Sequence, residues 1–123
     1  MNPTEYIKNA IRTESPQCLF SSMLTPMTRL LHGAMGICTE AGELLDVLKK
    51  CLFYNRKIDH DNVKEELGDV FWYLAIICNQ EGWTFEEIME ENIKKLKARY
   101  PEKFSEKDEQ NRDYQKEQEA AKK

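Results

Sequence analysis

The sequence is poor in histidine, proline and glycine, and it lacks a long apolar segment. Two histidines, four prolines and five glycines occur in 123 residues. No apolar run approaches the roughly 20 residues that a membrane-spanning helix needs. The first residues have neither the basic start nor the apolar run of a secretory signal peptide. We therefore expect a cytoplasmic protein that does not bind membranes.

An excess of positive charge is also absent. The chain has 18 lysines and arginines against 22 aspartates and glutamates, for a net charge of −4. Proteins that bind nucleic acid usually carry a basic patch, so we expect no nucleic-acid partner. The cysteines lie far apart in the sequence, and we interpret them as reduced core residues rather than as disulfides or metal ligands. They are Cys18, Cys38, Cys51 and Cys78.

Helical periodicity is what the sequence has instead. Apolar residues recur at helical spacing in four segments, each preceded by a capping signal. The predicted helices follow Asn2, Thr25, Asp61 or Asn62, and Thr84, and they end near residues 11, 54, 81 and 99. The length of the chain allows one domain with a modest core. We therefore predict an all-α protein, an antiparallel helical bundle, against which Cys18, Leu19 and Phe20 pack.

Two pairs of carboxylates interrupt the apolar faces of the second and third predicted helices. Glu40 and Glu43 form the first pair, and Glu66 and Asp69 form the second. Residues three apart on a helix lie about 60° apart around its axis and about 4.5 Å apart along it, so each pair shares a face. Burying an unpaired charge is costly, and acids beside apolar core positions therefore indicate a functional role.

Four carboxylates converge if these two helices pack against each other. Two like charges repel by about 4 kcal/mol at about 4 Å and an effective dielectric constant of about 20, so such a cluster needs cations. Neither histidine stands at a ligand spacing, and carboxylates alone favour Mg²⁺, with Mn²⁺ as a substitute. Because Mg²⁺ commonly binds substrate phosphates as well, we expect a phosphoanhydride substrate. Glu43 and Glu66 are the candidate bases for activating water.

The second predicted helix contains Gly33, Gly36 and Gly42. Each glycine costs a helix about 1 kcal/mol relative to alanine, which calls for a compensating role. Close approach of a neighbouring helix is one explanation. Room for a ligand beside Glu40 and Glu43 is the other, and the sequence favours neither.

Several polar residues could contact a nucleotide. Lys50 lies two helical turns after Glu43, although lysines at a helix end ordinarily complement the helix dipole. Asn92, Lys95 and Arg99 share one face of the fourth predicted helix, at positions i, i+3 and i+7. A polar outer face on that helix is the alternative interpretation of these three residues.

The two acidic pairs also carry a resemblance. Glu40-x-x-Glu43, a spacer, and Glu66-x-x-Asp69 with an embedded Leu-Gly resemble the motif of the all-α nucleoside triphosphate pyrophosphohydrolases of the MazG family. The segment from Asn92 to Phe104 is similar to the closing segment of that family. The resemblance covers about residues 30–104, and the specificity of the paired motif exceeds that of an isolated acidic pair.

The resemblance implies a function and a set of roles. Glu40, Glu43, Glu66 and Asp69 would be the Mg²⁺ ligands. The residues facing the nucleotide would be Asn92, Lys95, Arg99 and Tyr100. The family cleaves triphosphates between the α and β phosphates, which yields a nucleoside monophosphate and pyrophosphate. We therefore expect hydrolysis of dNTPs or aberrant nucleotides for control of the nucleotide pool.

The resemblance and the composition also predict the organisation of the chain. Residues 1–104 would form the MazG-like domain, which a homodimer or homotetramer would complete. Residues 105–123 are almost all charged or glutamine, and such segments cannot bury enough apolar surface to order themselves. We therefore expect a frayed helix or a disordered tail there.

Two other interpretations fit an acidic helical bundle. A di-iron carboxylate protein gathers Glu-x-x-His pairs on facing helices, but acids stand where those histidines are needed. The second alternative is a non-catalytic oligomeric module in which the acids form a solvent-exposed row.

Overall fold

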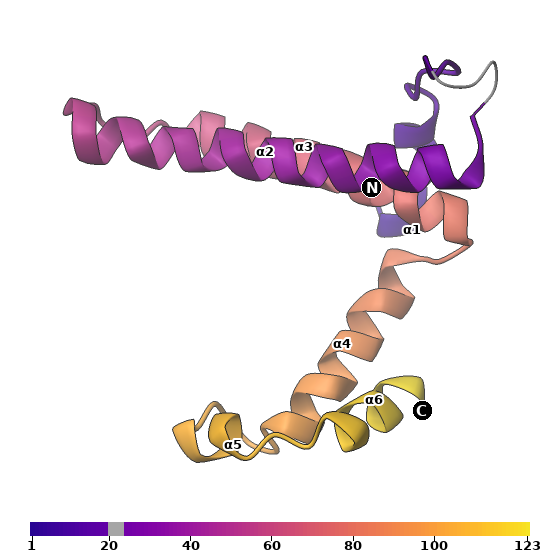
Figure 1. Cartoon of the computed structure of the whole chain (residues 1–123), viewed down its shortest axis with the longest axis vertical. Coiled ribbons are helices and arrows are strands. Elements are labelled where there is room, and N and C mark those ends of the chain that lie inside the picture. Colours follow the sequence, from indigo (N-terminus) through magenta and orange to yellow (C-terminus); the bar gives the residue numbers. More distant parts are fainter. Residues whose placement is uncertain (20–23) are drawn as a thin grey trace. The chain divides into compact units, whose positions relative to one another are not determined.

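The computed structural model describes residues 1–19 and 24–123, and every regular element among them is a helix. The elements are α1 (Pro3–Ile11), α2 (Pro26–Tyr54), α3 (His60–Glu81), α4 (Phe85–Arg99), α5 (Glu106–Gln110) and α6 (Tyr114–Lys122) (Figure 1). The all-α prediction is confirmed. Among these residues no helix combines enough length and apolarity to cross a bilayer. Leu19 is 95% exposed rather than packed, and Phe20 lies outside the described residues.

Helix starts follow the predicted caps with one exception. Asn2, Thr25 and Thr84 each cap a helix through a reciprocal capping box. The third helix begins earlier than predicted, because Asp59 is its cap and accepts a hydrogen bond from the Asn62 backbone N–H at 3.0 Å. The Asn62 side chain is used elsewhere, on Glu66. The prediction of Asp61 or Asn62 as the cap was therefore wrong.

The first compact unit comprises residues 1–82. Within it α2 and α3 run antiparallel along most of their length, and α1 packs against α3 (Figure 1). Its buried apolar residues are Ile7, Ala10, Val47, Ala75, Ile76 and Cys78. All four cysteines are free, as expected, but only Cys78 is a core residue and Cys38 is exposed.

The three helical glycines have different surroundings. Gly33 and Gly36 are buried where α2 meets α3, and a Cβ atom at either would collide with α3. At Gly42 no atom of the described residues lies within 4 Å of such a Cβ. Close helix approach therefore explains the first two glycines, while the third lies on an open face.

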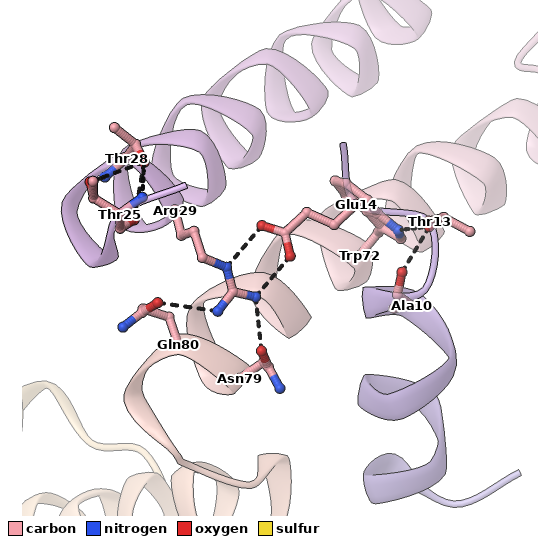
Figure 2. A network of polar contacts seen from close by, with 9 residues as sticks. All are labelled: Ala10, Thr13, Glu14, Thr25, Thr28, Arg29, Trp72, Asn79 and Gln80. Carbon is pink, nitrogen blue, oxygen red and sulfur yellow. Dashed lines mark hydrogen bonds and ion pairs between the residues drawn. The ribbon is translucent and has the colours of Figure 1, made fainter. Parts of the chain in front are cut away.

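A polar clamp joins three segments of this unit. The Arg29 guanidinium on α2 donates two hydrogen bonds to Glu14, at 2.9 and 2.8 Å. It also donates to Asn79 and Gln80 near the end of α3, as Figure 2 shows. Both members of the Arg29–Glu14 ion pair are largely buried, so the clamp joins Glu14 and the first turn of α2 to the end of α3.

The second compact unit comprises residues 83–123, in which α4 packs against α6. Glu117 on α6 is 3% exposed. Its carboxylate accepts hydrogen bonds from Arg99 at 3.0 and 2.9 Å and from Arg112 at 3.1 and 2.9 Å. The charged segment therefore forms two capped helices, the second of which contains the buried Glu117 with its two arginine partners. The composition predicts a frayed helix or a disordered tail there.

Candidate metal centre

Three of the four predicted acids converge between α2 and α3. Glu40 on α2 and Glu66 and Asp69 on α3 each offer a carboxylate oxygen, and these oxygens all lie within 4.8 Å of one another. Glu66 and Asp69 share a face of α3 because they are three residues apart. The antiparallel packing of α2 brings Glu40 opposite that face. Glu40 and Glu66 are partly buried, and Asp69 is exposed.

Like charge dominates this cluster. The pKa of Glu40 is raised by burial, by a hydrogen bond with Glu66 and by the negative charges of Asp69, Glu66 and Glu43. Within the described part of the chain, no lysine or arginine forms an ion pair with Glu40, Glu66 or Asp69. Hard oxygen donors without a protein cation are the donor set that Mg²⁺ and Mn²⁺ prefer. The residues present therefore fit a divalent ion.

Two residues near the cluster were missed by sequence reasoning. The Asn62 side-chain amide donates to Glu66 Oε1 at 2.7 Å and so fixes the orientation of that carboxylate. Its spacing of one helical turn before Glu66 was the available signal. The Tyr6 hydroxyl on α1 donates to the Gly68 carbonyl at 3.4 Å. Burial and the charge of Asp69 raise the pKa of Tyr6.

Glu43 does not belong to the group of oxygens that converge. It is exposed, one turn beyond Glu40 on α2. Its charge nevertheless contributes to the raised pKa of Glu40, which places it beside the cluster rather than in it.

Comparison with known proteins decides the family. The MazG nucleotide pyrophosphohydrolase domain matches residues 32–104, which is more than half of the chain. The chain belongs to the MazG nucleotide pyrophosphohydrolase domain family. Both acidic pairs and Asn62 lie inside the matched range, whereas Tyr6 precedes it.

A curated protein is similar to part of this chain. Gene 37 protein of Mycobacterium phage L5 is 34% identical to this chain over 74 residues. The aligned part covers 57% of this chain and 65% of the relative, so it spans less than two thirds of that protein. No solved structure matches the chain.

Lys50, a predicted phosphate contact of this MazG domain, has a partner within the chain. Lys50 Nζ lies 2.7 Å from Asp46 Oδ2, and Lys49 Nζ lies 2.9 Å from Asp46 Oδ1. Lys50 thus forms an ion pair on α2 in this structure, where the last turn contains no basic residue, and its contact with phosphate stays a prediction.

The predicted nucleotide contacts on α4 lie in the second unit. Arg99 is paired with Glu117, and the Tyr100 hydroxyl donates to Glu109. Asn92 is exposed and Lys95 is partly buried. The role of these four residues in binding a nucleotide stays a prediction.

Proposed function

We propose that this MazG domain is a Mg²⁺-dependent hydrolase of nucleoside triphosphates that releases a nucleoside monophosphate and pyrophosphate. Its substrates would be dNTPs or aberrant nucleotides, and its role would be control of the nucleotide pool. One observation carries the proposal, namely the convergence of Glu40, Glu66 and Asp69 without a protein cation. Membership of the MazG family supports assigning a pyrophosphohydrolase reaction to this cluster.

The three converging carboxylates would hold the ion. When bound, Mg²⁺ neutralises phosphate oxygens and makes a nearby water more acidic. Glu40 and Glu66 give the ion partly buried ligands, and Asp69 faces solvent, the side from which a nucleotide can approach. Asn62 keeps Glu66 aligned for this task, as outer-shell hydrogen bonds commonly do for metal ligands.

We assign the base to Glu43. Glu66 is the other candidate from the sequence, but it is engaged by Asn62 and lies inside the ligand group. Glu43 is exposed and stands one turn from Glu40, so its carboxylate is free to take a proton from a water that attacks the α phosphorus.

The polar residues outside the cluster would bind the rest of the substrate. Lys50, Asn92, Lys95, Arg99 and Tyr100 would contact phosphates, sugar or base. For Arg99 and Tyr100 this requires exchange of their present partners, Glu117 and Glu109, for the nucleotide.

The proposal also includes self-association. Large apolar side chains on α2 and α3 are open to water, and several of them are more than half exposed. A homodimer or homotetramer would cover such surfaces. These residues are Met27, Leu31, Met35, Leu45, Leu52, Phe53, Tyr54 and Phe71. Sedimentation at micromolar concentration should show at least a dimer, and a monomer alone would contradict this part of the proposal.

Product analysis tests the reaction. Each dNTP is incubated with the protein and Mg²⁺, and the products are identified by mass spectrometry. The monophosphate and pyrophosphate are expected, and diphosphate with inorganic phosphate would contradict α–β cleavage. Glu43→Gln should lower kcat by about 10²–10⁴-fold, the contribution typical of a general base. The matched control is Glu65→Gln, an exposed acid on α3, which should retain the activity of the unaltered protein.

A further inference from the structure

The geometry points to Gly36 as a positioning residue for the metal centre, through its contact with the ring of Tyr73. The inference rests on the proposed function, since it concerns the same cluster. Gly36 itself carries no ligand atom. Its role is to let α2 approach α3 closely enough for Glu40 to join Glu66 and Asp69.

The contact is unusually close. A Cβ atom at Gly36 would lie 2.1 Å from Tyr73 Cδ1 and Cε1 and 2.3 Å from its Cγ. These are atoms of the ring, and Cγ is bonded to Tyr73 Cβ, so rotation of the ring about the Cβ–Cγ bond does not move Cγ away. The ring is also held by its neighbours, because His32 and Trp72 make edge contacts with it at centroid distances of 5.6 and 5.0 Å. Room for an added methyl group therefore requires displacement of this packed ring and of the helix that carries it.

The position of this contact relative to the acids gives it a functional consequence. Glu40 follows Gly36 by four residues, and Asp69 precedes Tyr73 by four residues. In an antiparallel pair, both offsets amount to one helical turn in the same direction. The Gly36–Tyr73 contact is thus the layer adjacent to the layer of carboxylates. Separation of the helices at one layer widens the next, and the oxygens now within 4.8 Å would no longer reach a common ion.

Gly42 provides an internal control. It lies on the same helix, two residues after Glu40, and a Cβ there meets no described atom within 4 Å. Gly36→Ala and Gly42→Ala make the same chemical change at similar distances from the ligand Glu40. Only the first alters the spacing between α2 and α3.

The experiment measures Mn²⁺ binding by electron paramagnetic resonance on the full chain without nucleotide, together with the melting temperature. Gly36→Ala should weaken Mn²⁺ binding by about 10–100-fold, as loss of ligand orientation does in other metal sites. Gly42→Ala should leave it unchanged. Because Gly36→Ala could unfold the chain, the double variant Gly36→Ala/Tyr73→Ala removes every colliding ring atom, Cγ included, and should recover most of the binding.

The outcomes separate this inference from the proposed function. A lower melting temperature for Gly36→Ala with unaltered Mn²⁺ binding would overturn the inference, since the glycine would then serve stability alone. Failure of the double variant to regain binding while it remains folded would overturn it as well. The expected binding pattern without hydrolysis of any dNTP would support the positioning role and contradict only the proposed function.

Discussion

Each unit of this chain contains a carboxylate close to other charged groups, and the pKa of that carboxylate is lowered in one unit and raised in the other. In the second unit Glu117 is enclosed by two arginines, and their hydrogen bonds lower its pKa to about 2. In the first unit burial, a hydrogen bond with Glu66 and the charges of Asp69, Glu66 and Glu43 raise the pKa of Glu40. The guanidinium groups of the two arginines neutralise Glu117 within the protein. The Glu40 cluster has no such ion-pair partner among the described residues, and we propose that a divalent cation completes it.

The difference separates a structural site from a functional one. A buried charge that has its partners in the chain holds helices together, as Glu117 does for α4 and α6. A cluster of like charges works against folding and is kept where a ligand offsets the repulsion. Perturbed pKa values alone do not make this distinction, because both sites are perturbed. The sign of the shift and the identity of its cause do.

Removal of one converging acid should have the largest effect. Asp69→Asn takes one ligand from the cluster, so we expect a loss of kcat/KM beyond the roughly 10–100-fold that outer-shell substitutions cost. The assay is dNTP hydrolysis at saturating Mg²⁺. Asp61→Asn, an exposed acid on the same helix, is the control and should retain activity. Equal activity in the two variants would show that Asp69 holds no ion.

Removal of the orienting amide should have a smaller effect. Asn62→Ala leaves all three carboxylates but frees Glu66 from its 2.7 Å hydrogen bond. The Mg²⁺ concentration for half-maximal hydrolysis should rise by about 10–100-fold. Lys64→Ala, an exposed neighbour on α3, should leave this concentration unaltered. A fall in maximal rate without a change in Mg²⁺ dependence would argue against the orienting role.

Addition of Mg²⁺ together with a nucleotide should stabilise the folded protein. A ligand that binds only the folded state adds about 2.7 kcal/mol at a concentration 100 times its Kd. Mg²⁺ with a non-hydrolysable dNTP analogue should therefore raise Tm, and EDTA should reverse the change. Scanning calorimetry measures both. An unaltered Tm would favour the alternative of a non-catalytic helical module.

The stability contributed by Glu117 and its two arginines should fall at low pH. Because the folded-state pKa of Glu117 lies at about 2, below its ordinary value of 4.5, its contribution to stability is fully present above the ordinary value. The contribution is lost as the pH falls from that value through the folded pKa. Peptide-resolved hydrogen exchange should show loss of protection in α4 and α6 over this range. Glu117→Gln should abolish that pH dependence, and persistence of the dependence would assign it to other groups.

The smallest effect should come from the open glycine. Gly42→Ala changes neither the Glu40–Glu66–Asp69 cluster nor the Glu117 site. It should stabilise α2 by up to about 1 kcal/mol with no change in hydrolysis. Urea unfolding and the dNTP assay measure the two quantities. Gly82→Ala is the opposite control, because φ at Gly82 is +74° and a side chain there is strained. Loss of activity in Gly42→Ala would mean that the open face of α2 contacts a substrate or partner.

Sequence reasoning predicted the helices well because their signals are local. Asn2, Thr25 and Thr84 each act within one turn of the residues they cap. It failed at Asp59, since the choice of cap depended on the recruitment of the Asn62 side chain by Glu66. Propensity rules describe the backbone and contain no information on such competition between side chains.

Long-range pairing set the other limits. The two acidic pairs were visible in the sequence, but only the helix packing shows that Glu43 lies beside the converging group. Arg99 and Glu117 are 18 residues apart, and Tyr6 and Gly68 are 62 apart. Composition treats the charges of residues 105–123 as solvated, and only pairing in space reveals that one of them is buried.

The position of α1 matters for anyone trimming this polypeptide. The helix precedes the family match, which begins at residue 32, yet it supplies the buried Ile7 and Ala10 and brings Tyr6 to the backbone beside Asp69. A fragment cut at the family boundary would also lose Arg29 and Glu14, and the side of α3 that α1 covers would open to water. The smallest piece worth expressing therefore starts upstream of the region by which its relatives are recognised.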